Sequence, residues 1–236
     1  MTSGFTILHY DSIGSTNDEL RRLAAEGAVD GTVVHADEQT SGRGRMARSW
    51  FSPPGNLYMS ILLRTGVPVQ RTAEVGFVTA VAVAETVRAL VPAKVPVALK
   101  WPNDVLATEA KISGILVERA DEAVIVGVGL NTLEAPAVTG YRTTTIAAQG
   151  GIATVDGARD KLLERFGHLR GLWTEQGFAP IREAWLALSY PVGSVIKFTG
   201  PEGPITGRFL GLDLDGALLL DTPDGPTRFL AGDVSV

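Results

Sequence analysis

The 236-residue chain contains no cysteine and only three histidines. Disulfides, thiolate metal sites and cysteine nucleophiles are therefore excluded. The histidines, His9, His35 and His168, are isolated along the sequence, and no pair has metal-ligand spacing. The lack of cysteine fits a reducing compartment, so we expect a cytoplasmic protein.

A membrane-spanning run and a secretory leader are also missing. The longest apolar run of note, residues 75–84, lies between two glutamates and is too short to cross a bilayer. The first five residues, MTSGF, show neither the basic stretch nor the apolar core of a signal peptide. We expect no membrane partner.

The chain has fewer basic than acidic residues: 21 Lys and Arg against 26 Asp and Glu, which gives a formal net charge of -5. A protein whose whole surface coats nucleic acid would be basic, so that class is disfavoured. With 45% hydrophobic and 20% charged residues, the composition is that of a packed globule. Any anion-binding site must be a local cluster of positive charge.

Hydrophobic periodicity predicts an α+β core. Helices are expected at 16–27, 72–91, 158–176 and 181–189, and strands at 5–10, 32–38, 57–64, 97–101, 111–119 and 123–130. The first helix should begin with a capping box at 16–19 (TNDE), and strand 57–64 alternates as a half-buried strand does. The polar turn at 120–122 (ADE) predicts a hairpin.

The pattern of the sequence changes at Pro191, from predicted helices to short strands. Short strands are expected at 194–199, 204–212, 217–221 and 227–230, with Gly-Pro and Asp-Gly turns between them. Such a pattern is typical of a small β-barrel. We predict two domains, residues 1–190 and 191–236.

The most unusual segment is 39–50, QTSGRGRMARSW. Its arginines, Arg43, Arg45 and Arg48, are permanently charged, and guanidinium groups bind carboxylate or phosphate oxygens in pairs. The glycines allow the backbone to approach a ligand and to change shape. The segment predicts a loop for a polyanionic ligand, and a solvated basic loop is the alternative.

Neither common nucleotide fold is indicated. Residues 42–47 match the letters of a dinucleotide fingerprint, but WFSPP follows where a helix should begin, and the later acidic residue is missing. The sequence also lacks a Gly-x4-Gly-Lys-Ser/Thr phosphate loop. If the protein uses ATP, it does so by another architecture.

Two segments present polar groups at strand ends. In 100–104 (KWPND), Asn103 and Asp104 follow a proline, which taken alone is ordinary turn chemistry. In 111–118 (KISGILVE), Lys111 stands at the mouth of an apolar strand. A lysine facing a carboxylate and a phosphate can neutralise both, whereas an isolated lysine would be a surface residue.

A third strand, 127–131 (GVGLN), places Gly127, Gly129 and Asn131 on one face. A flat ligand could lie on such a face, with Asn131 recognising a ring edge. The alternative is close packing of another backbone against the sheet.

Together these segments resemble the biotin–protein ligase family, the biotin–[acetyl-CoA-carboxylase] ligases. The matching pieces follow the family's order and spacing from about Tyr10 to Asn131: GSTN (14–17), ADEQT (36–40), GRGR through W (42–50), KWPND, KISGILVE and GVGLN. The resemblance implies an α+β fold, with a mixed β-sheet catalytic domain flanked by helices, class II synthetase-like or biotin–lipoate ligase-like. The β module after Pro191 resembles the family's SH3-like β-barrel.

The resemblance also implies a two-step reaction. Biotin and Mg-ATP give biotinyl-5'-AMP and pyrophosphate, and a lysine of a biotin carboxyl carrier protein then attacks the mixed anhydride. Since that anhydride hydrolyses readily, the arginine loop should close over it and exclude water. The C-terminal module would help to shape the ATP or carrier site.

Residue roles carried over from the family are expectations. Lys111 and Arg45 would be catalytic, and Asp104 would coordinate Mg2+ or orient a neighbour. Biotin would be held by Ser15, Thr16, Asn17, Gln39, Arg43, Gly44, Arg45, Lys111 and Gly114. ATP would be held by Arg43, Arg48, Trp50, Asn103, Lys111 and Asn131.

The sequence departs from the family pattern at Ala47, where the family usually has glycine. If this position needs a positive φ, alanine costs roughly 1–2 kcal/mol, and we expect loop closure to survive it. Some members carry an N-terminal helix-turn-helix domain. With the first strand beginning by about Thr6, we expect no DNA binding. Both a monomer and a homodimer fit the sequence.

Two other functions are open. A lipoate–protein ligase or acyltransferase shares the related catalytic fold, but it predicts a long acyl tunnel and a different arginine motif. A non-catalytic regulator could bind an adenylate or nucleic acid through the arginine loop. The acidic net charge and the Lys111 segment argue against the regulator.

Overall fold

The computed structural model describes residues 4–64, 66, 68–137, 141–200 and 203–235. The predictions that fall on residues 1–3 and 236, the outer ends of the two predicted domains, lie outside the described residues.

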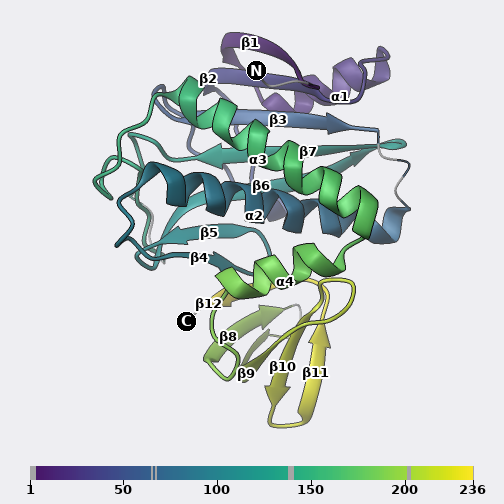
Figure 1. Ribbon diagram of the computed structural model, residues 1–236, viewed down its shortest axis with the longest axis vertical. Coiled ribbons are helices and arrows are strands. Elements are labelled where there is room, and N and C mark those ends of the chain that lie inside the picture. Colours follow the sequence, from purple (N-terminus) through teal and green to yellow (C-terminus); the bar gives the residue numbers. More distant parts are fainter. Residues whose placement is uncertain (1–3, 65, 67, 138–140, 201–202, 236) are drawn as a thin grey trace.

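A seven-stranded mixed sheet forms the larger part of the molecule, in the order β1-β2-β3-β7-β6-β5-β4 (Figure 1). Its strands are β1 (Thr6–Ile13), β2 (Thr32–Gln39), β3 (Leu57–Leu63), β4 (Val97–Lys100), β5 (Asp104–Ala107), β6 (Ala110–Ala120) and β7 (Ala123–Leu130). The pair β1 and β2 is parallel, and the other neighbouring strands pair antiparallel. The predicted mixed sheet of an α+β fold is confirmed.

The sheet is covered on both faces. Helix α1 (Thr16–Ala25) packs Leu20 on one face, against Val34, Leu62 and Ile125. On the other face lie α2, α3 and α4 (Figure 1). Their bounds are α2 (Thr72–Leu90), α3 (Val155–Gln176) and α4 (Ala179–Leu188), with a short 3-10 turn, η2 (Val69–Arg71), before α2. Helix α2 is apolar nearly all round because the sheet covers one side and α3 the other.

Two local predictions about this sheet are corrected. Strand β3 is buried along its whole length, not half-buried, because α1 covers the face that carries Tyr58, Ser60 and Leu62. The N-cap of α1 is Ser15, one residue before the predicted capping box, and its Oγ accepts from the Asp18 backbone N–H at 3.4 Å. Thr16 and Asn17, the first two residues of the helix, are buried.

The structure adds strand β5, which the sequence analysis missed. All four of its residues are buried, so they show no alternation of buried and exposed positions. Asp104 begins this strand and pairs in register with Lys100, so Pro102 and Asn103 form the turn between β4 and β5. The predicted hairpin at 120–122 is confirmed, with Ala120 paired to Ala123.

The C-terminal part is a five-stranded antiparallel sheet in the order β11-β10-β9-β8-β12. Its strands are β8 (Val195–Gly200), β9 (Gly203–Leu212), β10 (Leu218–Thr222), β11 (Gly225–Phe229) and β12 (Asp233–Ser235). The last strand was not predicted, because three residues carry no pattern. The two sheets meet where the Trp101 indole donates to the Gly216 carbonyl at 3.1 Å and packs near Phe198.

Among the helices that the structure describes, none is both long and apolar enough to cross a membrane.

Candidate active site

A cavity of about 250 Å3 opens between the start of α1, the arginine loop, strands β6 and β7, and strand β12. All the predicted site residues except Asn131 line it. They are Ser15, Thr16, Asn17, Gln39, Arg43, Gly44, Arg45, Arg48, Trp50, Asn103, Asp104, Lys111 and Gly114. Asn131 lines an adjoining pocket, which shares Arg48, Trp50 and Lys111 with the first.

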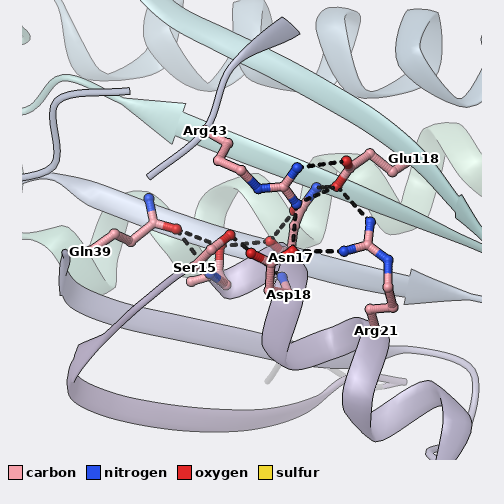
Figure 2. Close-up of polar contacts among 9 residues, drawn as sticks. Ser15, Asn17, Asp18, Arg21, Gln39, Arg43 and Glu118 are labelled. Atoms are coloured by element: carbon pink, nitrogen blue, oxygen red, sulfur yellow. Dashed lines mark hydrogen bonds and ion pairs between the residues drawn. The ribbon is translucent and has the colours of Figure 1, made fainter. Parts of the chain in front are cut away.

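One corner of the cavity is a buried network of uncharged polar groups at the start of α1 (Figure 2). The Gln39 Oε1 atom accepts from the Thr16 backbone N–H at 2.9 Å and from its hydroxyl at 3.1 Å. The Ser60 hydroxyl lies 2.5 Å from Asn17 Oδ1 and 2.7 Å from Thr16 Oγ1. A Cβ atom at Gly127 would collide with the Asn17 amide, so this approach requires glycine.

The arginine loop, residues 42–50, is a narrow turn rather than an extended segment. The Gly44 N–H donates to the Arg48 carbonyl at 2.7 Å, and the Trp50 N–H donates to the Gly42 carbonyl at 2.9 Å. Its tip is a short 3-10 turn, η1 (Arg45–Ala47), in which Ala47 has a φ of 57°. The backbone at Ala47 is therefore left-handed, which is the condition under which alanine is costly.

The three arginines of this loop bond to separate parts of the fold, strand β6 and the C-terminal strand β12, and Arg45 also bonds to the turn before β5. Arg43 binds Glu118 of β6 at 3.1 and 3.2 Å. Arg45 donates to Asn103 Oδ1 at 3.0 Å, and both Arg45 and Arg48 pair with Asp233 of β12. Burial alone would raise the pKa of Asp233, but its bond to Arg48 holds that pKa below the usual value.

Lys111 is held by one carboxylate and two aromatic rings. Its Nζ lies 2.7 Å from Asp104 Oδ1, while Lys100 Nζ lies 3.0 Å from the other oxygen. The ammonium is also 5.2 Å from the centre of the Trp50 ring and 5.6 Å from that of Tyr141. A fixed positive charge thus faces the cavity with its side chain only 16% exposed.

The glycine face of the sheet is covered by side chains, with Asn17 against Gly127 and Trp50 against Gly129. The Trp50 indole lies on Gly114 and Gly129, and a Cβ on Gly114 would be 2.8 Å from the ring. Within the described structure, the buried Trp50 Nε1 has no hydrogen-bond partner. The Asn131 amide is already used, because its Nδ2 donates to the Thr144 carbonyl at 3.1 Å.

Sequence reasoning missed several residues in or beside the cavity. Tyr141 lies in the loose segment after Asn131, and Asp233 lies in the unpredicted strand β12. Neither position carries a motif. Glu118 was read only as the end of the KISGILVE segment, although it binds Asn17 and Arg43.

The histidines are not isolated in space, because strand pairing brings His9 beside His35 with ring centres 5.1 Å apart. His9 Nε2 lies 2.9 Å from Asp37 Oδ1. His9, Asp11 and Asp37 form the one group of possible metal ligands found among the described residues. All three side chains are exposed and none lines the cavity, so we assign no function to them.

The matches to known families cover both parts of the chain. Residues 10–131 match the model of the biotin/lipoate A/B protein ligase family, and residues 192–236 match the biotin protein ligase C terminal domain. The chain belongs to the biotin/lipoate A/B protein ligase family. The match to this family spans every segment that lines the cavity except Tyr141 and β12, and β12 lies within the second match.

Relatives of this ligase family cover nearly the whole chain. A biotin–[acetyl-CoA-carboxylase] ligase from Paracoccus denitrificans is 36% identical over 93% of this chain and 96% of its own. The bifunctional ligase/repressor BirA of Bacillus subtilis is 32% identical over 99% of this chain and 74% of its own. Among solved structures, a biotin protein ligase from Aquifex aeolicus in complex with biotin and ATP has 31% identity and a TM-score of 0.85, covering 98% of this chain and 97% of the other.

Proposed function

We propose that this chain is an ATP-dependent biotin–protein ligase. It makes biotinyl-5'-AMP from biotin and ATP and transfers the biotinyl group to a lysine of a biotin carboxyl carrier protein. The observation that carries the proposal is that one cavity joins an uncharged polar corner, a held ammonium and three guanidinium groups. The similarity to the Paracoccus and Aquifex ligases supports the choice of biotin.

The polar corner at the start of α1 is the biotin subsite. A ureido ring is neutral, and it offers one carbonyl acceptor and two N–H donors. Ser15, Thr16, Asn17 and Gln39 are uncharged and can supply donors and acceptors on their cavity side. Gly44 and Gly114 line the cavity with them, and Lys111 marks the end at which the carboxylate lies.

Adenylation needs two anions to meet, and Lys111 is placed to bring them together. An oxygen of the biotin carboxylate attacks the α-phosphorus of ATP, and pyrophosphate leaves with the electrons of the broken P–O bond. The Lys111 ammonium neutralises the carboxylate and the charge that develops on the α-phosphate, helped by Arg45. Positioning and charge stabilisation suffice, so no protein nucleophile is required.

The nucleotide side comprises Arg43, Arg48, Trp50, Asn103 and Asn131. As part of the Mg-ATP substrate, Mg2+ would neutralise charge on the phosphates. Asp104 does not fit as its ligand, because both carboxylate oxygens already face ammonium groups, Lys111 at 2.7 Å and Lys100 at 3.0 Å. Asp104 instead orients Lys111, which was the second of its two predicted roles.

In the second step, the amine of the acceptor lysine attacks the acyl carbon, and AMP leaves. We place this reaction in the cytoplasm, in a monomer or a homodimer, with residues 1–190 as the catalytic domain and 191–236 as the C-terminal domain. The family match at 192–236 supports that boundary. Since Asp233, Val234 and Ser235 line the cavity, the C-terminal domain helps to shape the ATP site.

The test is biotin-dependent exchange of labelled pyrophosphate into ATP, with lipoate as the competing acid. Wild-type protein should exchange with biotin and not with lipoate. Lys111→Ala should lose at least about a hundredfold in rate, as for loss of a charge-stabilising donor. Lys94→Ala, at an exposed lysine, is the matched control. Exchange with lipoate alone would show that lipoate, not biotin, is the substrate. No exchange with either acid would contradict ligase activity.

A further inference from the structure

Glu118 lies just outside the cavity wall, yet it bonds to two parts of the site (Figure 2). Gly114, Leu116 and Glu118 follow one face of β6, and the first two line the cavity. The Glu118 Oε2 atom accepts from Asn17 Nδ2 at 2.7 Å. Its two oxygens accept hydrogen bonds from the two terminal nitrogens of Arg43, at 3.1 and 3.2 Å. One carboxylate thus connects α1 with the base of the arginine loop.

The Asn17 amide has its orientation fixed by these contacts. A carboxylate can only accept hydrogen bonds, so the Nδ2 side of the amide must face Glu118. Its Oδ1 then lies 2.5 Å from the Ser60 hydroxyl, which donates to it. A flipped amide would place oxygen against the carboxylate. Glu118 therefore decides which donor and which acceptor Asn17 presents to the cavity.

Glu118 also belongs to a balanced cluster of four charges. Asp18 Oδ1 accepts from Arg43 at 2.5 Å and from Arg21 at 2.7 Å, and Arg21 lies 3.2 Å from Glu118. Burial alone would raise the pKa of Glu118, but the Asn17 bond and the Arg43 charge hold it below its usual value. The carboxylate is ionised at neutral pH and keeps Arg43 docked on β6.

We infer that Glu118 is a positioning residue for biotin binding, because it orients the Asn17 amide and docks the arginine loop with a single carboxylate. The inference rests on the proposed function, since it takes the corner at α1 as the biotin subsite. Glutamine cannot replace both contacts. If its one oxygen accepts from Asn17, its NH2 group faces the Arg43 Nη1 atom, donor against donor.

The decisive comparison is between Glu118→Gln and Asp18→Asn, which remove the same charge from the same cluster. Asp18 uses one oxygen for both arginines, so asparagine can keep those bonds, and it makes no side-chain contact with Asn17. Biotin is titrated calorimetrically into the full chain without ATP. Glu118→Gln should raise the biotin Kd about tenfold or more, and Asp18→Asn by less than about threefold.

Kinetics separate positioning from a general structural defect. In pyrophosphate exchange, Glu118→Gln should raise the KM for biotin by a similar factor, while kcat at saturating biotin stays within about threefold of wild type. Exposed Glu122→Gln serves as the control for the substitution itself. If Glu118→Gln does not fold, Glu118→Asp keeps the charge but withdraws it by one methylene, and a biotin Kd raised about fivefold supports the inference.

Three results would overturn the inference. Equal effects of Glu118→Gln and Asp18→Asn would assign the effect to cluster charge and not to geometry. An unchanged biotin Kd in Glu118→Gln, or in Glu118→Asp where that variant replaces it, would remove Glu118 from the subsite while the ligase function stands. A wild-type chain that binds no biotin would remove the proposed function and this inference together.

Discussion

Arg45 Nη1 lies 3.4 Å from Asp233 Oδ1, so the arginine loop is joined to the last strand of the C-terminal sheet. Arg48 pairs with the other oxygen of the same carboxylate, and the Gly232 carbonyl also accepts from Arg45. A strand of three residues thus closes one wall of a cavity built from the other sheet.

This relationship predicts that Asp233→Asn loosens the loop. Because the ion pairs are partly exposed, we expect a modest effect, up to about a fivefold faster tryptic cleavage after Arg45 and Arg48 in the protein without nucleotide. Initial cleavage rates measure it. Asp224→Asn, at an exposed aspartate in the turn between β10 and β11, should cleave like wild type. Identical rates in both variants would show that Asp233 does not restrain the loop.

Asp104→Asn should impair the chemical step more than substrate binding. The amide cannot neutralise Lys111 and Lys100, so the Lys111 ammonium loses its fixed position. The loss of a charge-assisted hydrogen bond is worth about 1.5–3 kcal/mol, or roughly a ten- to hundredfold fall in kcat for pyrophosphate exchange. The biotin KM should change little. A rise in biotin KM with normal kcat would argue against this role.

Gly129→Ala should displace Trp50. The added Cβ would collide with the indole that covers this glycine. We expect a loss of about 1–3 kcal/mol in the free energy of unfolding and a higher KM for ATP. Gly171→Ala in α3 is the matched control, since a Cβ there meets nothing within 4 Å, and it should stabilise the chain by about 0.5–1 kcal/mol. Urea unfolding of both variants measures the difference.

Ala47 offers a test of loop strain. With its φ of 57°, Ala47→Gly should relieve about 1 kcal/mol, and Ala47→Val should add strain because a β-branched residue is an outlier there. We expect adenylation to be retained or increased in the glycine variant and reduced in the valine variant, measured as kcat/KM for ATP. The reverse order would mean that the loop adopts another backbone during the reaction.

Stability should fall in mild acid because of His35. Burial, and next the charges of Arg159 and His9, lower the pKa of His35 below its usual value. The unfolded chain binds the proton first, so the free energy of unfolding is highest above about pH 6.5 and falls as the pH drops below it. Urea unfolding at about pH 8 and about pH 5.5 should show a smaller decline in His35→Gln than in wild type. Exposed His168→Gln should decline like wild type.

The site was more predictable from sequence than two of the short strands, β5 and β12, were. Arg43, Lys111 and Asn17 belong to short sequence motifs. The residue types and spacing of such a motif indicate its chemistry before the fold is known. All four residues of β5 are buried and β12 has only three residues, so neither strand shows an alternating pattern. The full burial of β3 was missed for another reason: only the packing of α1 on its second face removes that face from water.

The sequence by itself predicted much of the cavity lining, because charge type, glycine placement and spacing are local features of the segments 14–17, 42–50 and 111–118. It also determined the α+β class, since hydrophobic periodicity follows from burial on one side of each element. The tertiary structure alone decided which partners these residues have. Trp50 on Gly129, Arg45 with Asp233, and Glu118 between Asn17 and Arg43 join residues far apart in the chain. Such contacts depend on how strands are ordered in the sheets, and no local pattern records that order.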